Sequence, residues 1–268
     1  MKPFVLAALA LLAAGLAPAA ARAQPVDVAL LLAVDVSLSM DYEEQRAQRE
    51  GYVAAVKHPA VLDAVARGRR GRIALAYLEW GGPYAQRLIM PWTVIDGAEA
   101  AAGFAEELAV APVTSSRGTS IAAALDYAIG LFADAPSADR QVVDVSGDGP
   151  NNMGPLVTEA RDRALAAGLE INGLPLMIKP TDRLFSIPEL DIYYQECVVG
   201  GPAAFVIPVL DPARFASAIR QKLILEIAGA PPRGIAPEAP PLRRAREPMD
   251  CTIGEKLYER WRRSMDWN

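Results

Sequence analysis

Apolar residues along the chain fall into runs that alternate between strand and helix patterns. Residues 26–36 form an almost continuous apolar run, which is typical of a parallel strand buried on both faces of a sheet. Further strands are predicted at 72–80, 86–95, 141–146, 171–178 and 203–210, and helices at 41–57, 59–67, 97–110, 120–133, 156–167 and 211–228. This alternation predicts a doubly wound α/β fold, with a mostly parallel sheet, one antiparallel edge strand at 86–95, and helices on both faces.

The first 23 residues have the pattern of a signal peptide. A basic residue precedes an apolar stretch at 4–20, and an A-x-A cleavage pattern ends at Ala23. A membrane anchor is the alternative, but the apolar stretch is short and is interrupted by Gly15 and Pro18. We therefore predict cleavage after Ala23, a periplasmic or secreted location, and a mature chain without a membrane span.

Length and composition bound the rest of the chain. We expect one domain at 24–229, with an irregular insertion at about 179–202. Residues 230–268 are expected to be a proline-rich linker and tail with a short helix at about 255–263. The net charge of −5 becomes more negative once the signal peptide is removed, so nucleic acid is not an expected partner.

The chain has two cysteines, Cys197 and Cys251. In an oxidising compartment an even pair favours a disulfide, and two unpaired thiols are the alternative. A disulfide would tie the tail to the insertion and allow the final helix to dock.

Oxygen-bearing side chains follow two of the predicted strands. Asp35, Ser37 and Ser39 come at the end of the first strand, Asp148 follows a later strand in the sequence Ser-Gly-Asp-Gly, and Thr119 lies in a loop before a helix. Loops at the carboxyl ends of parallel strands meet at one edge of the sheet. Because hard divalent cations prefer oxygen ligands, these five residues predict a metal site. Neutral hydroxyl ligands would leave the metal electron-poor and able to accept an anionic oxygen from outside.

The pattern D-x-S-x-S, a Thr in a Gly-containing loop, and S-G-D-G resembles the von Willebrand factor A family over about residues 26–228. It also looks like a group of uncharacterised secreted bacterial proteins of that superfamily, of the DUF1194 type. The resemblance implies a metal-ion-dependent adhesion site in which Ser37, Ser39 and Thr119 bind the metal directly and Asp35 and Asp148 act through water. It implies Mg²⁺, with Mn²⁺ or Ca²⁺ as alternatives, a protein partner that supplies an Asp or Glu carboxylate, and no enzymatic activity.

Other interpretations of these residues stay open. Each could simply cap a helix or turn, and an interaction module that uses no metal is possible. Asp35 with the later Gly-Asp-Gly also resembles haloacid dehalogenase-like phosphatases, but Ser37 and Asn152 stand where those enzymes usually carry acidic residues. The single histidine, His58, precedes Pro59 and is expected to cap a helix or lie at the surface rather than act as a base.

Two aromatic residues lie near the turn after the second strand. If that strand runs parallel to the first, Trp80 and Tyr84 lie at the metal-bearing edge. We hypothesise that they rim the partner surface, because aromatic residues are enriched at interface centres. The alternative is that both cover the edge of the sheet.

Overall fold

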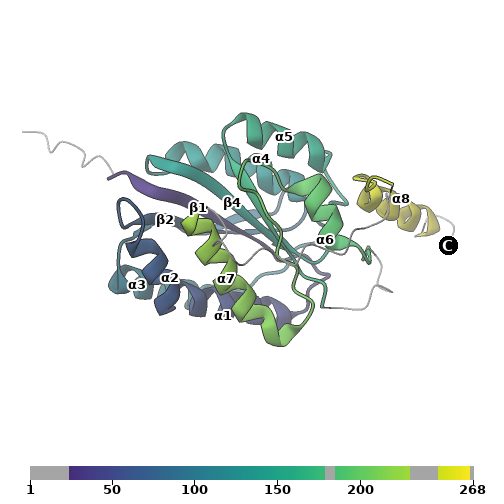
Figure 1. The fold of residues 1–268 in the computed structure, drawn as a ribbon. Helices are drawn as coiled ribbons and strands as arrows, with labels where there is room; N and C mark the ends of the chain where they lie inside the picture. Colours follow the sequence, from purple (N-terminus) through teal and green to yellow (C-terminus); the bar gives the residue numbers. More distant parts are fainter. Residues whose placement is uncertain (1–23, 179–184, 230–246, 266–268) are drawn as a thin grey trace, which may run out of the picture.

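The computed structural model describes residues 24–178, 185–229 and 247–265. The predicted signal peptide and most of the proline-rich linker lie outside the described residues. Within them the chain forms one mixed sheet with the strand order β3-β2-β1-β4-β5 (Figure 1), in which β3 alone is antiparallel to its neighbour. The strands are β1 (Val26–Asp35), β2 (Ile73–Trp80), β3 (Gln86–Ile95), β4 (Ala138–Gly147) and β5 (Glu170–Pro175). The predicted fold class is confirmed.

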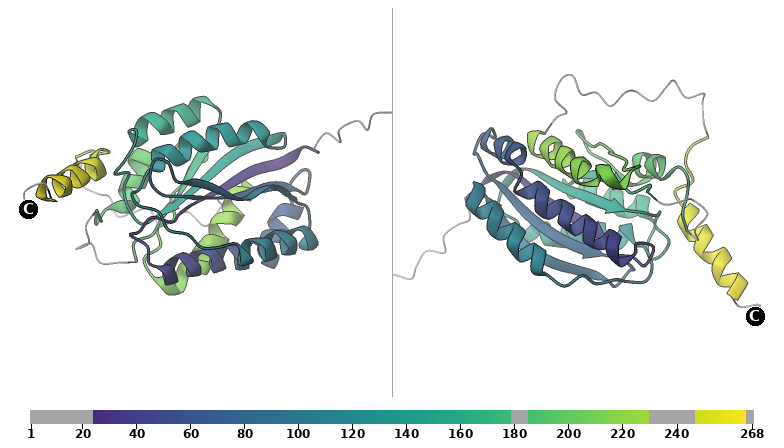
Figure 2. Two further views of the ribbon diagram at one scale, coloured as in Figure 1. Left: turned by 180° about the vertical axis from the view of Figure 1, so that it is seen from behind. Right: turned by 90° about the horizontal axis from the view of Figure 1, so that it is seen from below.

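Helices cover both faces of the sheet, and one further helix lies beyond its edge (Figures 1 and 2). One face carries α1 (Tyr42–Val56), α2 (Pro59–Ala66), α3 (Ala98–Val110) and α7 (Phe215–Ala228). The other carries α4 (Ile121–Leu131), α5 (Val157–Ala166) and the short α6 (Leu190–Tyr193). The last helix, α8 (Ile253–Met265), lies outside both layers, past the end of the sheet at which β1 finishes.

The central strand β1 explains the almost uninterrupted apolar run near the start of the domain. Leu31 and Ala33 pack into the core beneath α4 and α5, whereas Leu32 and Val34 pack into the core beneath α1 and α7. Because successive side chains of a strand point to opposite faces, a strand covered on both sides needs apolar residues at every position. This double burial fixes β1 in place and thereby fixes the loop that follows it.

Two helices begin with caps that the sequence encodes locally. Asp41 accepts a hydrogen bond from the Glu44 amide at 3.0 Å, and Glu44 accepts one from the Asp41 amide at 2.8 Å, which forms a capping box for α1. The His58 Nδ1 accepts from the Ala60 amide at 3.1 Å and caps α2. The expectation that His58 caps a helix is confirmed.

The expected irregular insertion is partly helical. Within its described part, α6 continues into a π-helical turn, Tyr194–Val198, so the expectation of irregular structure there is wrong. The buried residues recur at a spacing of three or four, which places them on one helical face against β5 and α5; they are Leu190, Tyr193, Tyr194, Cys197 and Val198.

The strand expected at 203–210 is also a correction. This segment runs parallel beside β5 but pairs with it only through isolated bridges, Val206 to Gly173 and Val209 to Leu176. Pro208 has no N–H to donate. The Phe205 amide donates to the Asn172 side chain instead of to a backbone carbonyl. Regular ladder pairing is therefore interrupted along an otherwise strand-like sequence.

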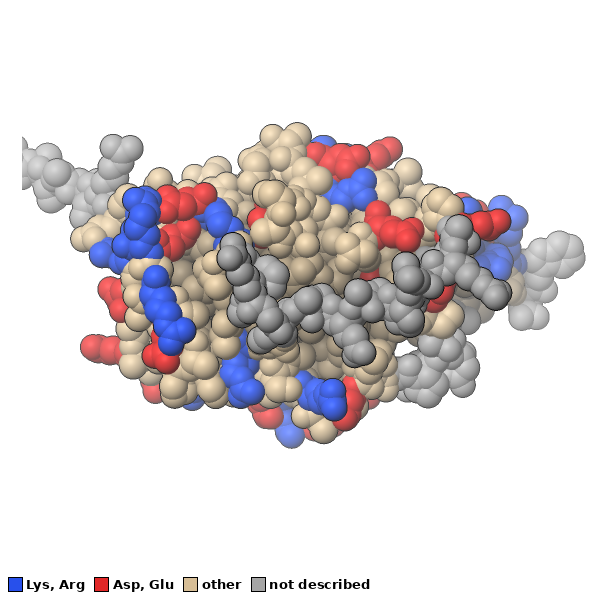
Figure 3. Space-filling model, viewed as in Figure 1, with Lys and Arg blue, Asp and Glu red and all other residues tan. Residues whose placement is uncertain are grey.

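Two properties of the surface bear on partners. On the face drawn in Figure 3, basic and acidic side chains are interspersed and neither sign forms a continuous field. Among the described residues, none of the helices has the length and the apolar character needed to cross a bilayer.

Candidate metal-binding edge of the sheet

The loops that carry the predicted ligands meet at one edge of the sheet. Strands β1 and β4 are adjacent and parallel, with Val34 opposite Ser146, so the loops after them leave the sheet side by side. The loop before α4 is attached to the loop after β1, because the Ser116 amide donates to the Val36 carbonyl at 2.9 Å and the Leu38 amide donates to the Ser116 carbonyl at 2.9 Å. Three loops that are far apart in sequence therefore form one surface.

Four of the five predicted ligands form a connected hydrogen-bonded group. The Ser37 and Ser39 hydroxyl oxygens are 2.7 Å apart, and the Ser39 hydroxyl donates to Asp148 Oδ1 at 2.6 Å. The Ser37 amide donates to Asp35 Oδ1 at 2.7 Å. The carboxylate at the end of β1 and the carboxylate just after β4 are thus joined through two serines.

Thr119 is brought to the same edge through a neighbour of Asp148. The Thr119 amide donates to Asn152 Oδ1 at 2.9 Å, and the Asn152 amide donates to the Thr119 carbonyl at 2.9 Å. This reciprocal pair fastens the Thr119 loop to the loop that carries Asp148. The sequence motifs do not point to Asn152, because its role is to hold backbone rather than to present a ligand.

The electrostatic environment of Asp35 is unfavourable for a lone carboxylate. Its side chain is fully buried, and its Oδ2 has no hydrogen-bond partner. Burial, with the nearby charge of Asp148, raises the pKa of Asp35 to about 8, although hydrogen bonds from Ser37 act in the opposite direction. A cation between these groups would offset both the burial and the repulsion, so the residues present fit a divalent metal.

Asp35 is tightly packed on the side of Gly147. A Cβ on Gly147 would lie 2.8 Å from Asp35 Oδ2 and 2.9 Å from the Tyr194 hydroxyl oxygen. Burial and the charges of Asp35 and Asp148 raise the pKa of Tyr194 well above its ordinary value, so this hydroxyl stays protonated beside the site. Sequence reasoning missed Tyr194, and the helical spacing of buried residues in its segment was the available signal.

The donor set differs from an acidic metal cage. Within the described ranges, no group of three or more His, Cys, Asp or Glu side chains is placed to hold a metal ion. A metal at this edge would therefore depend on the hydroxyls of Ser37, Ser39 and Thr119 as well as on two carboxylates.

The predicted aromatic rim is only partly consistent with the structure. Strand β2 does run parallel to β1, with Trp80 opposite Asp35, so the turn after it lies at the edge that carries the candidate ligands. Trp80 itself is fully buried in the core beneath α4, because β2 is an inner strand, and its assignment to the partner rim is wrong. Tyr84 is fully exposed.

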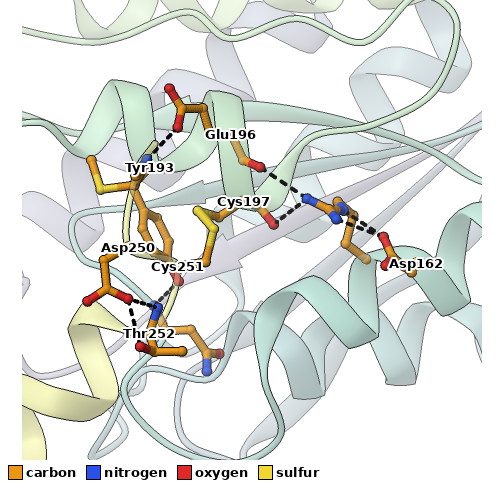
Figure 4. The surroundings of a disulfide bond; sticks show 10 residues. Asp162, Tyr193, Glu196, Cys197, Asp250, Cys251 and Thr252 are labelled. Carbon is orange, nitrogen blue, oxygen red and sulfur yellow. Dashed lines mark hydrogen bonds and ion pairs between the residues drawn. A yellow bond between two sulfur atoms is a disulfide. The ribbon is translucent and has the colours of Figure 1, made fainter. Parts of the chain in front are cut away.

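The predicted disulfide between Cys197 and Cys251 is confirmed. Their Cα atoms are 5.5 Å apart, within the usual range for a disulfide. Figure 4 shows the bond joining the π-helical turn after α6 to the segment that leads into α8, with Tyr193 and Glu196 close by. The tail is therefore covalently tied to the insertion.

Comparisons with known proteins agree with this architecture. Residues 25–231 match the model of the family described as "Protein of unknown function (DUF1194)", whereas no curated protein matches the chain. A von Willebrand factor type A protein from Catenulispora acidiphila is similar with a TM-score of 0.53 at 17% identity, covering 76% of this chain and 43% of that one.

Two further structures cover a similar share of the chain. The von Willebrand factor domain of the type V pili tip protein Mfa5 from Porphyromonas gingivalis has a TM-score of 0.52 at 12% identity, covering 76% of this chain and 97% of that one. Proximal thread matrix protein 1 from the mussel byssus, with a zinc-occupied metal-ion-dependent adhesion site, has a TM-score of 0.52 at 12% identity, covering 76% and 48%.

The chain spans less than half of the length of the first structures it matches. At these identities the likeness concerns the fold. Because the family model matches more than half of the chain, the chain belongs to the DUF1194 family, and it has the von Willebrand factor A fold.

Proposed function

We propose that the chain is an exported protein-binding module, not an enzyme, and that it binds a carboxylate of its partner through a divalent cation at the metal-binding edge. The observation that carries the proposal is the hydrogen-bonded group that joins Asp35 to Asp148 through Ser37 and Ser39. Neutral hydroxyl groups bring two carboxylates together without neutralising them, so both carboxylates would stabilise a bound cation.

The residues have separate roles in this proposal. Ser37, Ser39 and Thr119 would bind the cation directly, and Asp35 and Asp148 would hold it through water. The bound cation would supply a Lewis-acidic coordination position for an Asp or Glu side chain of the partner. Mg²⁺ is the expected ion, with Mn²⁺ or Ca²⁺ as alternatives, because all ligands are oxygen atoms.

Proteins with the same fold support an adhesion-type role. One similar structure is the pilus adhesin SpaC from Lactobacillus rhamnosus GG, and another is the mussel byssus protein whose adhesion motif contains zinc. The disulfide Cys197–Cys251 supports an oxidising location outside the cytoplasm, such as the periplasm or the extracellular space.

Exposed apolar side chains surround the proposed cation site. Leu38 and Tyr42 are each 60% exposed in and just after the loop that carries the serines, and Tyr84 is fully exposed in the turn after β2. Exposed apolar groups around a charged centre are typical of protein interfaces. We propose that these three, without Trp80, contact the partner around its carboxylate.

Calorimetric titration of Mg²⁺ and Mn²⁺ into the mature chain from Gln24 tests the proposal. Asp148→Asn should abolish binding while leaving the circular dichroism spectrum unchanged. Asp96→Asn is the matched control, because Asp96 is exposed where β3 ends, at the opposite edge of the sheet. A phosphate monoester assay on the same samples should show no hydrolysis.

Two results would contradict the proposal. Absence of metal binding to well-folded wild-type protein would favour a metal-free interaction module. Hydrolysis that disappears in an Asp35→Asn variant would favour a phosphatase instead.

A further inference from the structure

The last helix of the chain touches the loop that carries Asp148. Glu255, in the first turn of α8, accepts a hydrogen bond from Asn151 Nδ2 at 2.7 Å. At Gly254 the helix approaches so closely that a Cβ there would overlap the Asn151 carbonyl oxygen. Asn151 is three residues from Asp148, so α8 packs directly on the metal-bearing loop.

Two independent links hold the start of α8 in this position. The disulfide joins Cys251 to Cys197, and the Met249 amide donates to Glu196 Oε2 at 2.6 Å. The π-helical turn that carries Cys197 is itself fixed, because Arg161 on α5 donates to the carbonyls of Glu196 and Cys197 at 3.1 and 3.3 Å.

Aromatic side chains extend the contact along α8. Tyr258 and Trp261 pack against Phe185, with ring centroids 6.0 and 5.8 Å from the Phe185 ring. Ile253 packs against the core beneath α4 and α5. Apolar contacts therefore hold the helix in place in addition to the disulfide.

Asn151 also forms hydrogen bonds to other segments around the site. Its Oδ1 accepts from the Ala122 amide in the first turn of α4 at 3.0 Å, its Nδ2 also donates to the Pro155 carbonyl at 3.0 Å, and its amide donates to the Tyr193 hydroxyl at 3.2 Å. The next residue, Asn152, holds Thr119. One short loop thus connects α8, the insertion, α4 and two of the proposed ligands.

We propose that the disulfide-linked segment 249–265 is a working part of the metal-binding edge: it positions the loop 148–155, and through Asn151 and Asn152 it sets the placement of Asp148 and Thr119. Asn151 and Glu255 are positioning residues in this proposal. The part that concerns cation affinity rests on the proposed function, whereas the positioning of the loop does not. Removing groups that orient metal ligands typically weakens binding about 10- to 100-fold.

Amide hydrogen exchange on the metal-free mature chain tests the positioning. Gly254→Ala introduces the overlap with Asn151, although Ala is the better helix former, and Glu255→Ala removes the hydrogen bond. Both should accelerate exchange at the amides of Thr119 and Asn152 by about 10-fold or more, whereas Arg260→Ala, at an exposed position of the same helix, should not. Glu255→Gln keeps an acceptor oxygen for Asn151, so exchange in this variant should stay as slow as in the wild type.

Mg²⁺ titration of the same variants tests the consequence for the site. Gly254→Ala and Glu255→Ala should weaken Mg²⁺ binding about 10-fold or more, and Glu255→Gln and Arg260→Ala should bind as the wild type does. By linkage, saturating Mg²⁺ should slow reduction of the disulfide by a dithiol in the wild type. A purely structural role for α8 would lower the unfolding midpoint and leave the Kd of the folded protein unchanged.

The outcomes separate this inference from the proposed function. Unchanged exchange at Thr119 and Asn152 in both Gly254→Ala and Glu255→Ala would overturn the inference whatever the protein binds. Faster exchange in the two variants, combined with a wild type that binds no metal, would refute the proposed function and leave the positioning established. Faster exchange with unchanged Mg²⁺ affinity would overturn the claim that α8 sets the site.

Discussion

Two pairs of carboxylates each have one member on β4 or just beyond its end, Asp144 with Glu226 of α7 and Asp148 with Asp35 of β1, and the protein compensates their charges differently. Between Asp144 and Glu226 lies Lys222, whose Nζ is 2.7 Å from Asp144 Oδ1 and also hydrogen-bonds to Glu226. All three side chains are buried. Between Asp35 and Asp148 lie serine hydroxyls, which carry no charge. The first pair is neutralised in part by the chain itself.

This difference distinguishes a structural cluster from the proposed binding site. An internal lysine is a permanent counter-charge, and it ties α7 to the sheet because Lys222 and Glu226 are on that helix whereas Asp144 is on β4. Hydroxyl groups can bind a cation but carry no charge of their own, so under the proposed function the pair at the edge would gain most from an ion bound from solution. The following changes test whether the two pairs differ in this way.

Loss of the internal cation should have the largest effect. Lys222→Met leaves two buried carboxylates facing each other and should lower the free energy of unfolding by about 3–5 kcal/mol, because a buried charge that loses its partner keeps its desolvation penalty. Urea unfolding monitored by circular dichroism measures this loss. Lys57→Met, at the exposed end of α1, is the control and should change stability by less than about 0.5 kcal/mol.

A double variant sharpens the result. Adding Glu226→Gln to Lys222→Met removes one of the two acids and should recover part of the lost stability. No recovery would mean that the lysine stabilises the fold by packing rather than by charge.

An external cation should stabilise the second pair by a smaller amount. Mg²⁺ at 100 times its Kd should raise the free energy of unfolding by about 3 kcal/mol, since it binds the folded state only. The same addition should leave Asp148→Asn unchanged and should act fully on Lys222→Met, because the two clusters are separate. Thermal unfolding with and without a chelator measures this effect. Equal stabilisation of Asp148→Asn would place the cation elsewhere.

Crowding at Gly147 offers a third test of the edge. Gly147→Ala would place a methyl group against Asp35 and Tyr194 and should cost about 1–3 kcal/mol of stability. Gly130→Ala is the matched control, because Gly130 lies within α4 and a Cβ there meets nothing within 4 Å. That control should stabilise the protein by up to about 1 kcal/mol. Urea unfolding of both variants decides the matter, and similar gains at both positions would contradict the tight packing seen around Asp35.

The sequence predicts those features that follow from a local pattern of residues. The uniform apolar run of β1 and the D-x-S-x-S motif at its end predict the sheet and the edge of the candidate site, because strand direction alone carries Asp35 and Asp148 to the same side. The cysteine pair predicts the disulfide for a similarly simple reason, since the chain has no other cysteine.

Other features depend on contacts between distant segments. The burial of Trp80 follows from the position of β2 inside the sheet, which the turn residues around it do not encode. Tyr194 lies beside Asp35, and Asn151 hydrogen-bonds to Glu255 of α8; local sequence patterns do not encode partners from such distant segments. The Lys222 cluster combines helix positions four residues apart with an acid from a strand far away in sequence.

The smallest expected effect is the pH dependence of the free energy of unfolding that the Lys222 cluster causes. Burial, together with the charge of Asp144, raises the pKa of Glu226 from an ordinary value of 4.5 to about 8, against the opposing effect of Lys222. Between these two values the folded protein keeps a proton that the unfolded chain releases, so the free energy of unfolding should fall as pH rises from about 4.5 to 8. The slope for one proton is on the order of 1 kcal/mol per pH unit.

Glu226→Gln should flatten that decline, because the amide cannot lose the proton, whereas Glu50→Gln on the exposed face of α1 should leave the slope unchanged. Urea unfolding at several pH values in the presence of a chelator measures both slopes, with Asp35 contributing the same background to each variant. An equally steep profile in Glu226→Gln would assign the retained proton to Asp144, whose pKa is also raised by burial. It would then be the strand, rather than the helix, that carries the neutral acid of the cluster.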